Sequence, residues 1–356
     1  MTPLQTLAAG IPEEIGAAII TGKYNRRYYT GLLSSAGTLL VTREKCRFVI
    51  DSRYFEPARK TIKGCEVVLQ DKLYEQIGEF FREQGVKTAA VESDICTVKA
   101  LAEYRENLPG VEIPDDGRLA RLISEQRMRK TPEELGHMRA AQAIADRTFS
   151  HILGWIKPGK TERDIALEIE FYGRSLGAEG AAFPFIVASG ENSAIPHAAP
   201  GNRAVRPGDF LTMDFGFISE GYCSDMTRTV AVGHAGERQR MAYGTVLRAQ
   251  KAGLAAIRPG VICRDVDAAA REIIDSSPFK GSFGHGLGHS LGLELHEQPR
   301  FDKLCETPLE PGMALSVEPG IYLPGEFGVR IEDIAAVTGE GCENLTASPK
   351  ELIILY

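Results

Sequence analysis

The chain has 356 residues, of which 43% are hydrophobic and 25% charged. These proportions are ordinary for a globular protein and exclude a wholly disordered or fibrous chain, and the length predicts two domains. The 48 acidic side chains outnumber the 41 basic ones, giving a net charge of −7, which does not favour nucleic acid or an anionic membrane as a partner. No apolar run reaches the ~20 residues of a membrane span, and we read no signal peptide at the start.

The seven cysteines are expected to be free thiols. They are odd in number, scattered along the chain and never spaced as Cys-x-x-Cys. This pattern predicts neither a disulfide framework nor a structural zinc site. Reduced cysteines are typical of the cytoplasm, so we expect a cytoplasmic protein.

Residues 1–125 alternate between strand and helix patterns, which predicts an α/β domain. Strands are expected at 17–20, 37–41, 46–50, 67–69 and 87–91, with the second and third forming a hairpin, and helices at 73–83 and 98–106. The polar, basic stretch 124–130 is the expected boundary. After it, Thr131, Pro132 and Glu134 have the order of a helix start with a capping box.

Residues 130–356 contain an internal repeat. The segment 156–165 reappears 101 residues later as 257–266, each time with a Pro-Gly turn between two helix patterns. Further along, 206–216 corresponds to 310–320, where a Pro-Gly turn leads into an apolar strand that carries an acid. Two copies are too few for a solenoid. We therefore predict an α+β domain built from two halves about a pseudo-two-fold axis.

The repeat predicts a cluster of four carboxylates. Asp214 and Glu318 occupy equivalent positions, and a second acid follows each of them in strand-like sequence, Asp225 and Glu332. Four converging carboxylates in a partly buried site cannot all stay ionised without positive charge. A pair of divalent cations supplies that charge. Oxygen-rich ligands favour manganese, and an imidazole keeps cobalt, iron and zinc compatible.

Histidines add further candidates to this site. His285, His289 and His296 fall in or next to the glycine-rich segment 284–292, whose glycines allow the backbone to approach metal or substrate closely. His197 stands ahead of the first pair of acids much as His296 stands ahead of the second. We interpret His197 and His296 as related partners beside the metals. A phosphate-binding loop is disfavoured, because the Lys-Ser/Thr of a P-loop is absent.

The segments that carry these residues resemble the metal-dependent pita-bread peptidases, the clan of methionine aminopeptidase, aminopeptidase P and prolidase. The matching segments are 213–216, 224–229, 284–289, 318–320 and 329–333. The first domain is similar to the creatinase-type N-terminal domain at 29–31, 50–54 and 129–134. The resemblance implies a creatinase-like α/β domain at 1–125 and a pita-bread catalytic domain at 130–356.

Within this clan the sequence looks like the proline-specific members. Methionine aminopeptidases usually lack such a first domain, and creatinase lacks the metal ligands, whereas the text at 195–197, 293–297 and 318–322 is similar to proline-specific enzymes. The resemblance implies a homodimeric Xaa-Pro peptidase, either a dipeptidase (prolidase) or an aminopeptidase, acting on small peptides with proline second. The alternatives are an aminopeptidase of other N-terminal specificity and a scaffold without catalysis.

The resemblance also implies a role for each site residue. Two metal ions and the hydroxide between them are held by Asp214, Asp225, His289, Glu318 and Glu332, of which Asp225 and Glu332 bridge the ions. His296 stabilises the oxyanion, and His197 and His285 contact the substrate or its leaving group. Glu318 is also the proton shuttle. Arg330 and Tyr322 orient the carboxylates.

Overall fold

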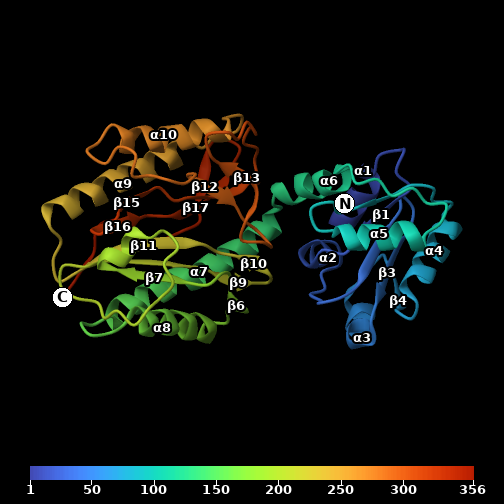
Figure 1. Ribbon diagram of the computed structural model, residues 1–356, viewed down its shortest axis with the longest axis horizontal. Coiled ribbons are helices and arrows are strands. Elements are labelled where there is room, and N and C mark those ends of the chain that lie inside the picture. Colours follow the sequence, from blue (N-terminus) through green and yellow to red (C-terminus); the bar gives the residue numbers. More distant parts are fainter. The chain divides into compact units, whose positions relative to one another are not determined.

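The computed structural model describes all 356 residues. They divide into two compact units, Met1–Arg127 and Met128–Tyr356, which we describe one at a time (Figure 1). No helix in either unit combines the length and the apolar character that crossing a lipid bilayer requires.

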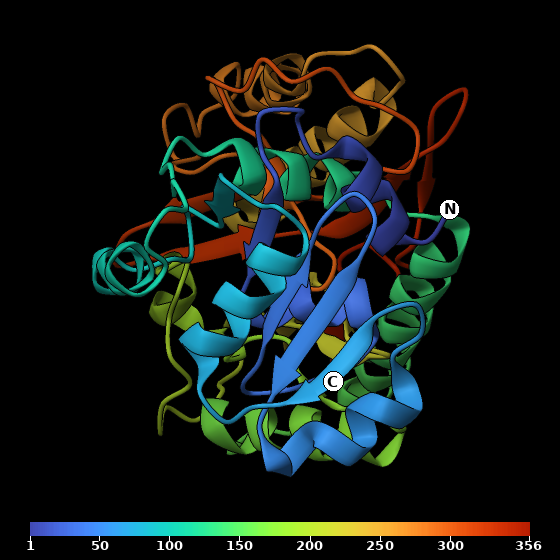
Figure 2. The ribbon, with the colours of Figure 1, turned by 90° about the vertical axis from the view of Figure 1, so that its right-hand side faces the viewer.

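A five-stranded mixed sheet forms the centre of the first unit, in the order β4-β3-β2-β1-β5 (Figure 2). Its strands are β1 (Ala17–Ile20), β2 (Thr38–Val41), β3 (Cys46–Ile50), β4 (Glu66–Leu69) and β5 (Ala89–Val91). The helices are α1 (Pro3–Gly10), α2 (Lys23–Thr30), α3 (Ser52–Thr61), α4 (Leu73–Glu83), α5 (Val98–Asn107) and α6 (Arg118–Met128). The expected hairpin is the antiparallel pair β2–β3, and β4 and β5 join the sheet in parallel. All five predicted strands and both predicted helices are present.

This sheet is buried on both faces because successive side chains of a strand point in opposite directions. In β1, Ala18 and Ile20 pack in a core with residues of α1, α2, α3 and α6. Ala17 and Ile19 pack on the opposite face, in a core formed with α4 and α5. Near-continuous apolar strands of this kind are what the sequence patterns detected.

The two units divide between Arg127 and Met128, inside the stretch 124–130, where α6 continues to Met128. One expectation for the first unit is wrong. The cysteines are not all free, since Cys46 and Cys65 form a disulfide. The parallel register of β3 and β4 sets Arg47 opposite Glu66, which brings the preceding cysteines to a Cα separation of 4.8 Å. The other five cysteines are free.

The second unit contains two larger sheets flanked by helices, and all their strand pairs are antiparallel except β11–β19, which is parallel. Its helices are α7 (Pro132–Trp155), α8 (Glu162–Ser175), η1 (Gly190–Ala194), α9 (Glu237–Ala256) and α10 (Cys263–Asp275). Its strands are β6 (Gly180–Ala181), β7 (Ile186–Ser189), β8 (Phe210–Phe215), β9 (Phe217–Ser219), β10 (Tyr222–Cys223), β11 (Met226–Val232), β12 (Gly288–Ser290), β13 (Glu297–Phe301), β14 (Ala314–Val317), β15 (Gly320–Leu323), β16 (Phe327–Arg330), β17 (Asp333–Val337), β18 (Cys342–Asn344) and β19 (Ile354–Leu355). In Figure 1 the strands lie between the pair α7–α8 and the pair α9–α10.

The predicted internal repeat is confirmed by this topology. Helices α8 and α10 begin 101 residues apart, and each is preceded by an isolated bridge, at Thr161 and at Ile262. In the first half β8 pairs with β7 and β11, and in the second β14 pairs with β12 and β17, all antiparallel. Each half also has its own core, one around α7 and α8 and the other around α9 and α10.

The start of α7 follows its predicted capping pattern. The Thr131 hydroxyl accepts a hydrogen bond from the Glu134 backbone, and the Glu134 carboxylate accepts one from the Thr131 N–H. Pro132 takes the first helical position, where no backbone donor is needed. These reciprocal bonds satisfy two otherwise free donors and fix the first residue of the second unit's long helix.

Candidate metal and catalytic site

The predicted ligands meet in one cavity of about 640 Å³ in the second unit. Every predicted site residue except Tyr322 lines it: His197, Asp214, Asp225, His285, His289, His296, Glu318, Arg330 and Glu332. Tyr322 lies behind the wall, where its hydroxyl contacts His285 and Arg330. Apolar residues at 183–186 and 198–200 form another part of the lining. The cavity therefore combines a polar, acidic wall with an apolar one.

The four acids reach this cavity from equivalent strands of the two halves. Asp214 lies within β8 and Asp225 directly before β11, while Glu318 directly follows β14 and Glu332 directly precedes β17. The Glu332 N–H donates to the Thr227 carbonyl at 3.1 Å, which joins the two halves beside the site. The repeat in the sequence thus becomes a convergence of carboxylates in space.

His289 lies among these acids with a nitrogen aimed at them. Its Nε2 is 3.6 Å from Asp225 Oδ2 and 3.5 Å from Glu318 Oε1. Its Nδ1 is 3.2 Å from the Ser290 carbonyl, which can only accept, so Nδ1 carries the proton and the Nε2 lone pair faces the acids. Burial lowers the pKa of His289 to about 4, which keeps the ring neutral and able to bind a metal.

The donor set fits divalent metal ions. Asp225, His289 and Glu332 each offer a ligand atom within 4.8 Å of the others. Asp214 Oδ1 and Asp225 Oδ1 are buried and have no hydrogen-bond partner in the chain, although buried polar atoms are nearly always paired. Carboxylate oxygens with one imidazole are suitable ligands for manganese and its neighbours in the first transition row.

The electrostatics of the chain alone demand positive charge at this place. Burial raises the pKa of Asp225 well above its usual range, and the charges of Asp214 and Glu318 raise it further. Burial and neighbouring acids also raise the pKa of Glu332, and burial raises that of Glu318 to about 7. Without cations these side chains bind protons more tightly than free carboxyl groups do. Cations therefore compete with protons for the same oxygen atoms.

Arg330 supplies the only direct ion pair to a ligand acid. Its Nη2 donates to Asp214 Oδ2 at 2.5 Å, its Nη1 to the Tyr322 hydroxyl at 2.9 Å, and its Nε to the Thr227 hydroxyl at 3.0 Å. The Thr227 hydroxyl in turn donates to Glu332 Oε2 at 2.6 Å. One buried guanidinium therefore contacts an acid of the first half directly and an acid of the second half through Thr227.

The other three histidines differ in how freely they face the cavity. Both His285 nitrogens are engaged, Nδ1 with the Gly286 carbonyl at 2.8 Å and Nε2 with the Tyr322 hydroxyl at 3.0 Å, so this ring offers its edge to a ligand. His197 and His296 are exposed on the wall. The His296 ring stands edge-on to that of His289, with centroids 4.4 Å apart. Burial lowers the pKa of His296, which favours its neutral form.

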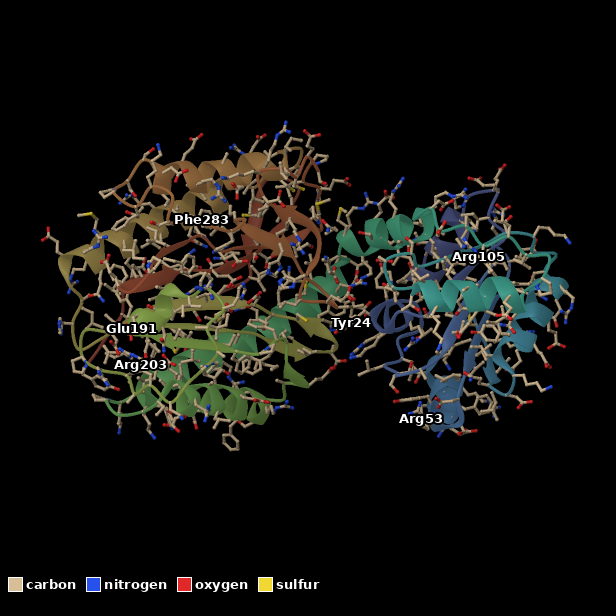
Figure 3. All side chains as sticks on the ribbon, viewed as in Figure 1. Tyr24, Arg53, Arg105, Glu191, Arg203 and Phe283 are labelled. Carbon is tan, nitrogen blue, oxygen red and sulfur yellow. A yellow bond between two sulfur atoms is a disulfide. The ribbon has the colours of Figure 1, made fainter.

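The loop that carries His197 is hydrogen-bonded to Glu162, the first residue of α8. The buried Glu162 carboxylate accepts from the Ser189 N–H at 2.8 Å, from the Asn192 amide at 3.0 Å and from the Gly201 N–H at 3.1 Å. Arg203, labelled in Figure 3, donates to the Ser189 hydroxyl at 2.7 Å. Both ends of the loop are thus tied to one carboxylate.

Two glycines near His289 allow close approach to neighbouring backbone. A Cβ on Gly288 would lie 2.0 Å from the Ser316 carbonyl oxygen, and one on Gly286 would lie 2.8 Å from that of Phe301. Both glycines also line the cavity. The Ser316 hydroxyl also accepts from the His289 N–H at 3.0 Å and donates to Glu318 at 3.1 Å.

Sequence reasoning missed two polar residues of the site. Thr227 links Arg330 to Glu332, and Arg300 lines the cavity from β13, with its side chain exposed. Thr227 is part of the quoted segment 224–229 but has no charge to single it out. Arg300 has no counterpart in the internal repeat, and an arginine four residues after a histidine is no signal by itself.

Metal removal is expected to make stability fall as the pH rises. The pKa of Glu318 is raised to about 7 in the folded chain from 4.5, so the folded state binds its proton more tightly than the unfolded state. This stabilisation is complete below pH 4.5 and is lost as the pH rises through 7, a loss of about 3 kcal/mol for this group. In chelator, the urea midpoint should be lower at pH 8 than at pH 5.5. Added Mn²⁺ should raise it more at pH 8, and a chelated midpoint that rises with pH would contradict this account.

Two family models match the chain. The model of metallopeptidase family M24 matches residues 136–339, and that of the creatinase/prolidase N-terminal domain matches residues 12–129. These are the segments in which the motifs predicted the resemblance, so the predicted family and the predicted pair of folds are confirmed. The family implies divalent metal ions, in agreement with the donor set.

Individual relatives cover nearly the whole chain. The Xaa-Pro dipeptidase of Pyrococcus horikoshii is 34% identical over 343 residues, 95% of each chain. The solved structure of an Xaa-Pro dipeptidase from Bacillus anthracis is similar with a TM-score of 0.95 and 39% identity, over 99% of both chains. That of an X-Pro aminopeptidase from Thermotoga maritima has a TM-score of 0.89 and 32% identity, over 96% of this chain and 97% of the other.

Proposed function

We propose that this chain, which belongs to metallopeptidase family M24, is an Xaa-Pro dipeptidase that hydrolyses the bond before a C-terminal proline. The observation that carries the proposal is the cavity itself. It is lined by four acids, an imidazole and an exposed arginine, Arg300. The relatives named Xaa-Pro dipeptidase support the same substrate class.

In this proposal two divalent ions are held by Asp214, Asp225, His289, Glu318 and Glu332, the residues whose oxygen and nitrogen atoms converge in the cavity. When bound, the ions supply a Lewis acid for the peptide carbonyl and lower the pKa of a water molecule. An Xaa-Pro bond suits such a site, because its nitrogen has no N–H with which a strand-like peptidase groove could pair.

The chain's own groups move the protons. Ser316 occupies Oε1 of Glu318, which leaves Oε2 to take a proton from the attacking water and return it to the proline nitrogen. The neutral His296 donates a hydrogen bond to the developing oxyanion. His197 contacts the substrate from the opposite half, and His285 does so through its ring edge.

Arg300 is the reason to prefer a dipeptide over a longer peptide. Arg330, the other arginine of the cavity, is committed to Asp214 and Tyr322, whereas Arg300 is exposed on the wall. The proline of an Xaa-Pro dipeptide ends in a carboxylate, and a guanidinium binds a carboxylate in a charge-assisted, bidentate manner. A tripeptide has an amide at this point.

Replacing Arg300 by methionine should therefore raise KM for an Xaa-Pro dipeptide about ten- to a hundredfold, the value of a hydrogen bond to a charged group. The matched control is the same dipeptide with a neutral C-terminal amide, on which wild type and Arg300→Met should perform alike. Steady-state kinetics on both substrates decide the matter. Equal losses on both would show that Arg300 does not read the carboxylate.

The experiment that tests the function measures proline release with metal-stripped protein, with and without Mn²⁺. The substrates are an Xaa-Pro dipeptide and an Xaa-Pro-Xaa tripeptide. Mn²⁺-dependent cleavage of the dipeptide alone is the expected result. Cleavage of the tripeptide at Xaa-Pro would instead assign an Xaa-Pro aminopeptidase. If neither is cleaved while metal is bound, the proposal fails in favour of another N-terminal specificity or a scaffold.

Three finer points complete the proposal. The metal is manganese, two ions per chain, which metal analysis after loading tests. The enzyme is a homodimer, as the resemblance implies, and light scattering of the purified protein tests this.

The enzyme acts in the cytoplasm, and its five free cysteines support this location. Alkylation of thiols in cells should then find Cys46 and Cys65 reduced there, although they pair in this structure.

A further inference from the structure

We propose that Lys130 is a positioning residue for His289 and His296. The inference rests on the proposed function, because it assigns Lys130 to the geometry of two histidines that this function uses. Lys130 lies in the predicted domain boundary at 124–130. In the structure it is buried, with its side chain 1% exposed.

One ammonium group binds the residues that directly follow both histidines. Lys130 Nζ donates to the Ser290 hydroxyl at 3.1 Å and to Glu297 Oε2 at 3.0 Å. Ser290 and Glu297 lie opposite each other in the pairing of β12 with β13. The histidines line the cavity, whereas Ser290 and Glu297 do not. Lys130 thus contacts the β12–β13 hairpin through residues that face away from the cavity, next to the two histidines that line it.

The hairpin needs this support because its own ladder is irregular here. The register of β12 and β13 shifts between His289 and Ser290, and Pro299 has no N–H to donate. A bulged ladder does not by itself fix the spacing of two side chains. The His289 and His296 ring centroids nevertheless lie 4.4 Å apart, so an additional contact must set their separation.

Close packing around Lys130 makes it a rigid anchor. Its N–H donates to the Gly312 carbonyl at 2.8 Å. A Cβ on Gly312 would come within 2.8 Å of the Lys130 carbonyl oxygen. On the other side, a Cβ on Gly292 would lie 2.9 Å from both Glu297 carboxylate oxygens and 3.0 Å from Lys130 Cε. Lys130 and Glu297 are therefore closely packed on both sides.

The segment between β12 and β13, which contains Gly292, also contacts the first half of the unit close to one of its acids. The Gly292 carbonyl accepts from the Cys223 N–H at 2.7 Å, two residues before Asp225. A displacement of the loop at Lys130 would therefore move His289 relative to Asp225 Oδ2, to which its Nε2 now lies 3.6 Å away. The expected consequence is a weaker metal site together with a slower chemical step.

The experiment compares Lys130→Met with the double variant Lys130→Met/Glu297→Gln, which leaves no unpaired buried charge. Arg129→Met is the matched control, because the neighbouring Arg129 pairs with Glu310 at the surface. Four quantities are measured: the Kd for Mn²⁺ by calorimetry, kcat and KM on an Xaa-Pro dipeptide, and the urea midpoint. Support around a metal ligand is typically worth ten- to a hundredfold in metal affinity or activity.

We expect Lys130→Met to raise the Mn²⁺ Kd and lower kcat, each about ten- to a hundredfold, with KM within about twofold. In the double variant the urea midpoint should recover towards wild type while Kd and kcat stay impaired. Recovery of Kd and kcat together with the midpoint would overturn the proposal, because Lys130 would then serve stability alone. If Lys130→Met does not fold, the double variant decides by the same criterion. Arg129→Met should match wild type.

The Mn²⁺ titration separates this proposal from the proposed function. It needs no substrate, so a wild-type chain that binds Mn²⁺ and cleaves no Xaa-Pro peptide defeats the proposed function and leaves the Kd comparison intact. Variants that bind Mn²⁺ with the wild-type Kd and keep the wild-type kcat defeat the positioning role even if the peptidase assay succeeds.

Discussion

Replacement of Asp225 by asparagine is expected to abolish metal loading at one or both positions and to lower kcat/KM at least about a thousandfold, or about 4 kcal/mol of transition-state stabilisation. Asp225 stands between the halves, 3.6 Å from His289 Nε2, with Oδ1 buried and unpartnered. An amide of the same shape lacks the negative charge of the carboxylate. Metal analysis of the loaded variant and steady-state kinetics are the measurements.

The same substitution should make the metal-free protein more stable. Burial and the neighbouring acids raise the pKa of Asp225 well above its usual range, so at pH 8 the wild-type chain must either ionise this group at a cost or hold a proton. Asparagine removes that cost. A higher urea midpoint in chelator, combined with lost metal, marks a residue kept for function rather than for folding. Normal metal content with full activity would remove Asp225 from the ligand set.

The sequence predicted the fold best where residues close together in the chain determine the local structure. The strands of the first unit are short apolar runs between turns, and the Thr131 capping box is complete within four residues. Helix α2 was not predicted, because the face it buries includes Asn25 and Arg26, which interrupt the apolar periodicity. The Cys46–Cys65 pair escaped because only the pairing of β3 with β4 makes the two cysteines neighbours.

The sequence predicted those residues of the candidate site that have an equivalent residue in the other half of the internal repeat. Two equivalent halves must place equivalent acids near their common axis, and this argument needs no coordinates. Residues without a counterpart in the other half, such as Arg300 and Lys130, carry no such signal. Their importance comes from burial or from a place on the cavity wall, which depends on how distant strands pack. Sequence therefore predicted the ligands better than the groups that support them or select the substrate.

Arg228 shows how much of the site's support lies outside the cavity. Its side chain is 1% exposed and pairs with the fully buried Asp333 at 2.7 Å. It also donates to the Glu332 carbonyl at 2.6 Å and to those of Ser348 at 2.7 Å and Pro349 at 2.9 Å. A single guanidinium therefore joins β11, the segment before β17 and the C-terminal segment.

Arg228→Met is expected to lower the free energy of unfolding by about 3–5 kcal/mol, because it leaves the buried Asp333 short of a partner and strips donors from three carbonyls. The triple variant Arg228→Met/Asp333→Asn/Lys350→Met also removes Lys350, the second cation that pairs with Asp333, at 2.6 Å. It should recover part of this loss, since no unpaired buried charge remains. The control is Arg238→Met, whose pair with Glu326 is about half exposed and is worth at most about 1 kcal/mol. Urea unfolding of the three variants with Mn²⁺ present measures all of these differences. Equal small losses for Arg228→Met and Arg238→Met would show that the network does not hold the halves together. A large loss for Arg228→Met with wild-type Mn²⁺ content below the transition would place its contribution in the fold and leave the ligand geometry to Arg330.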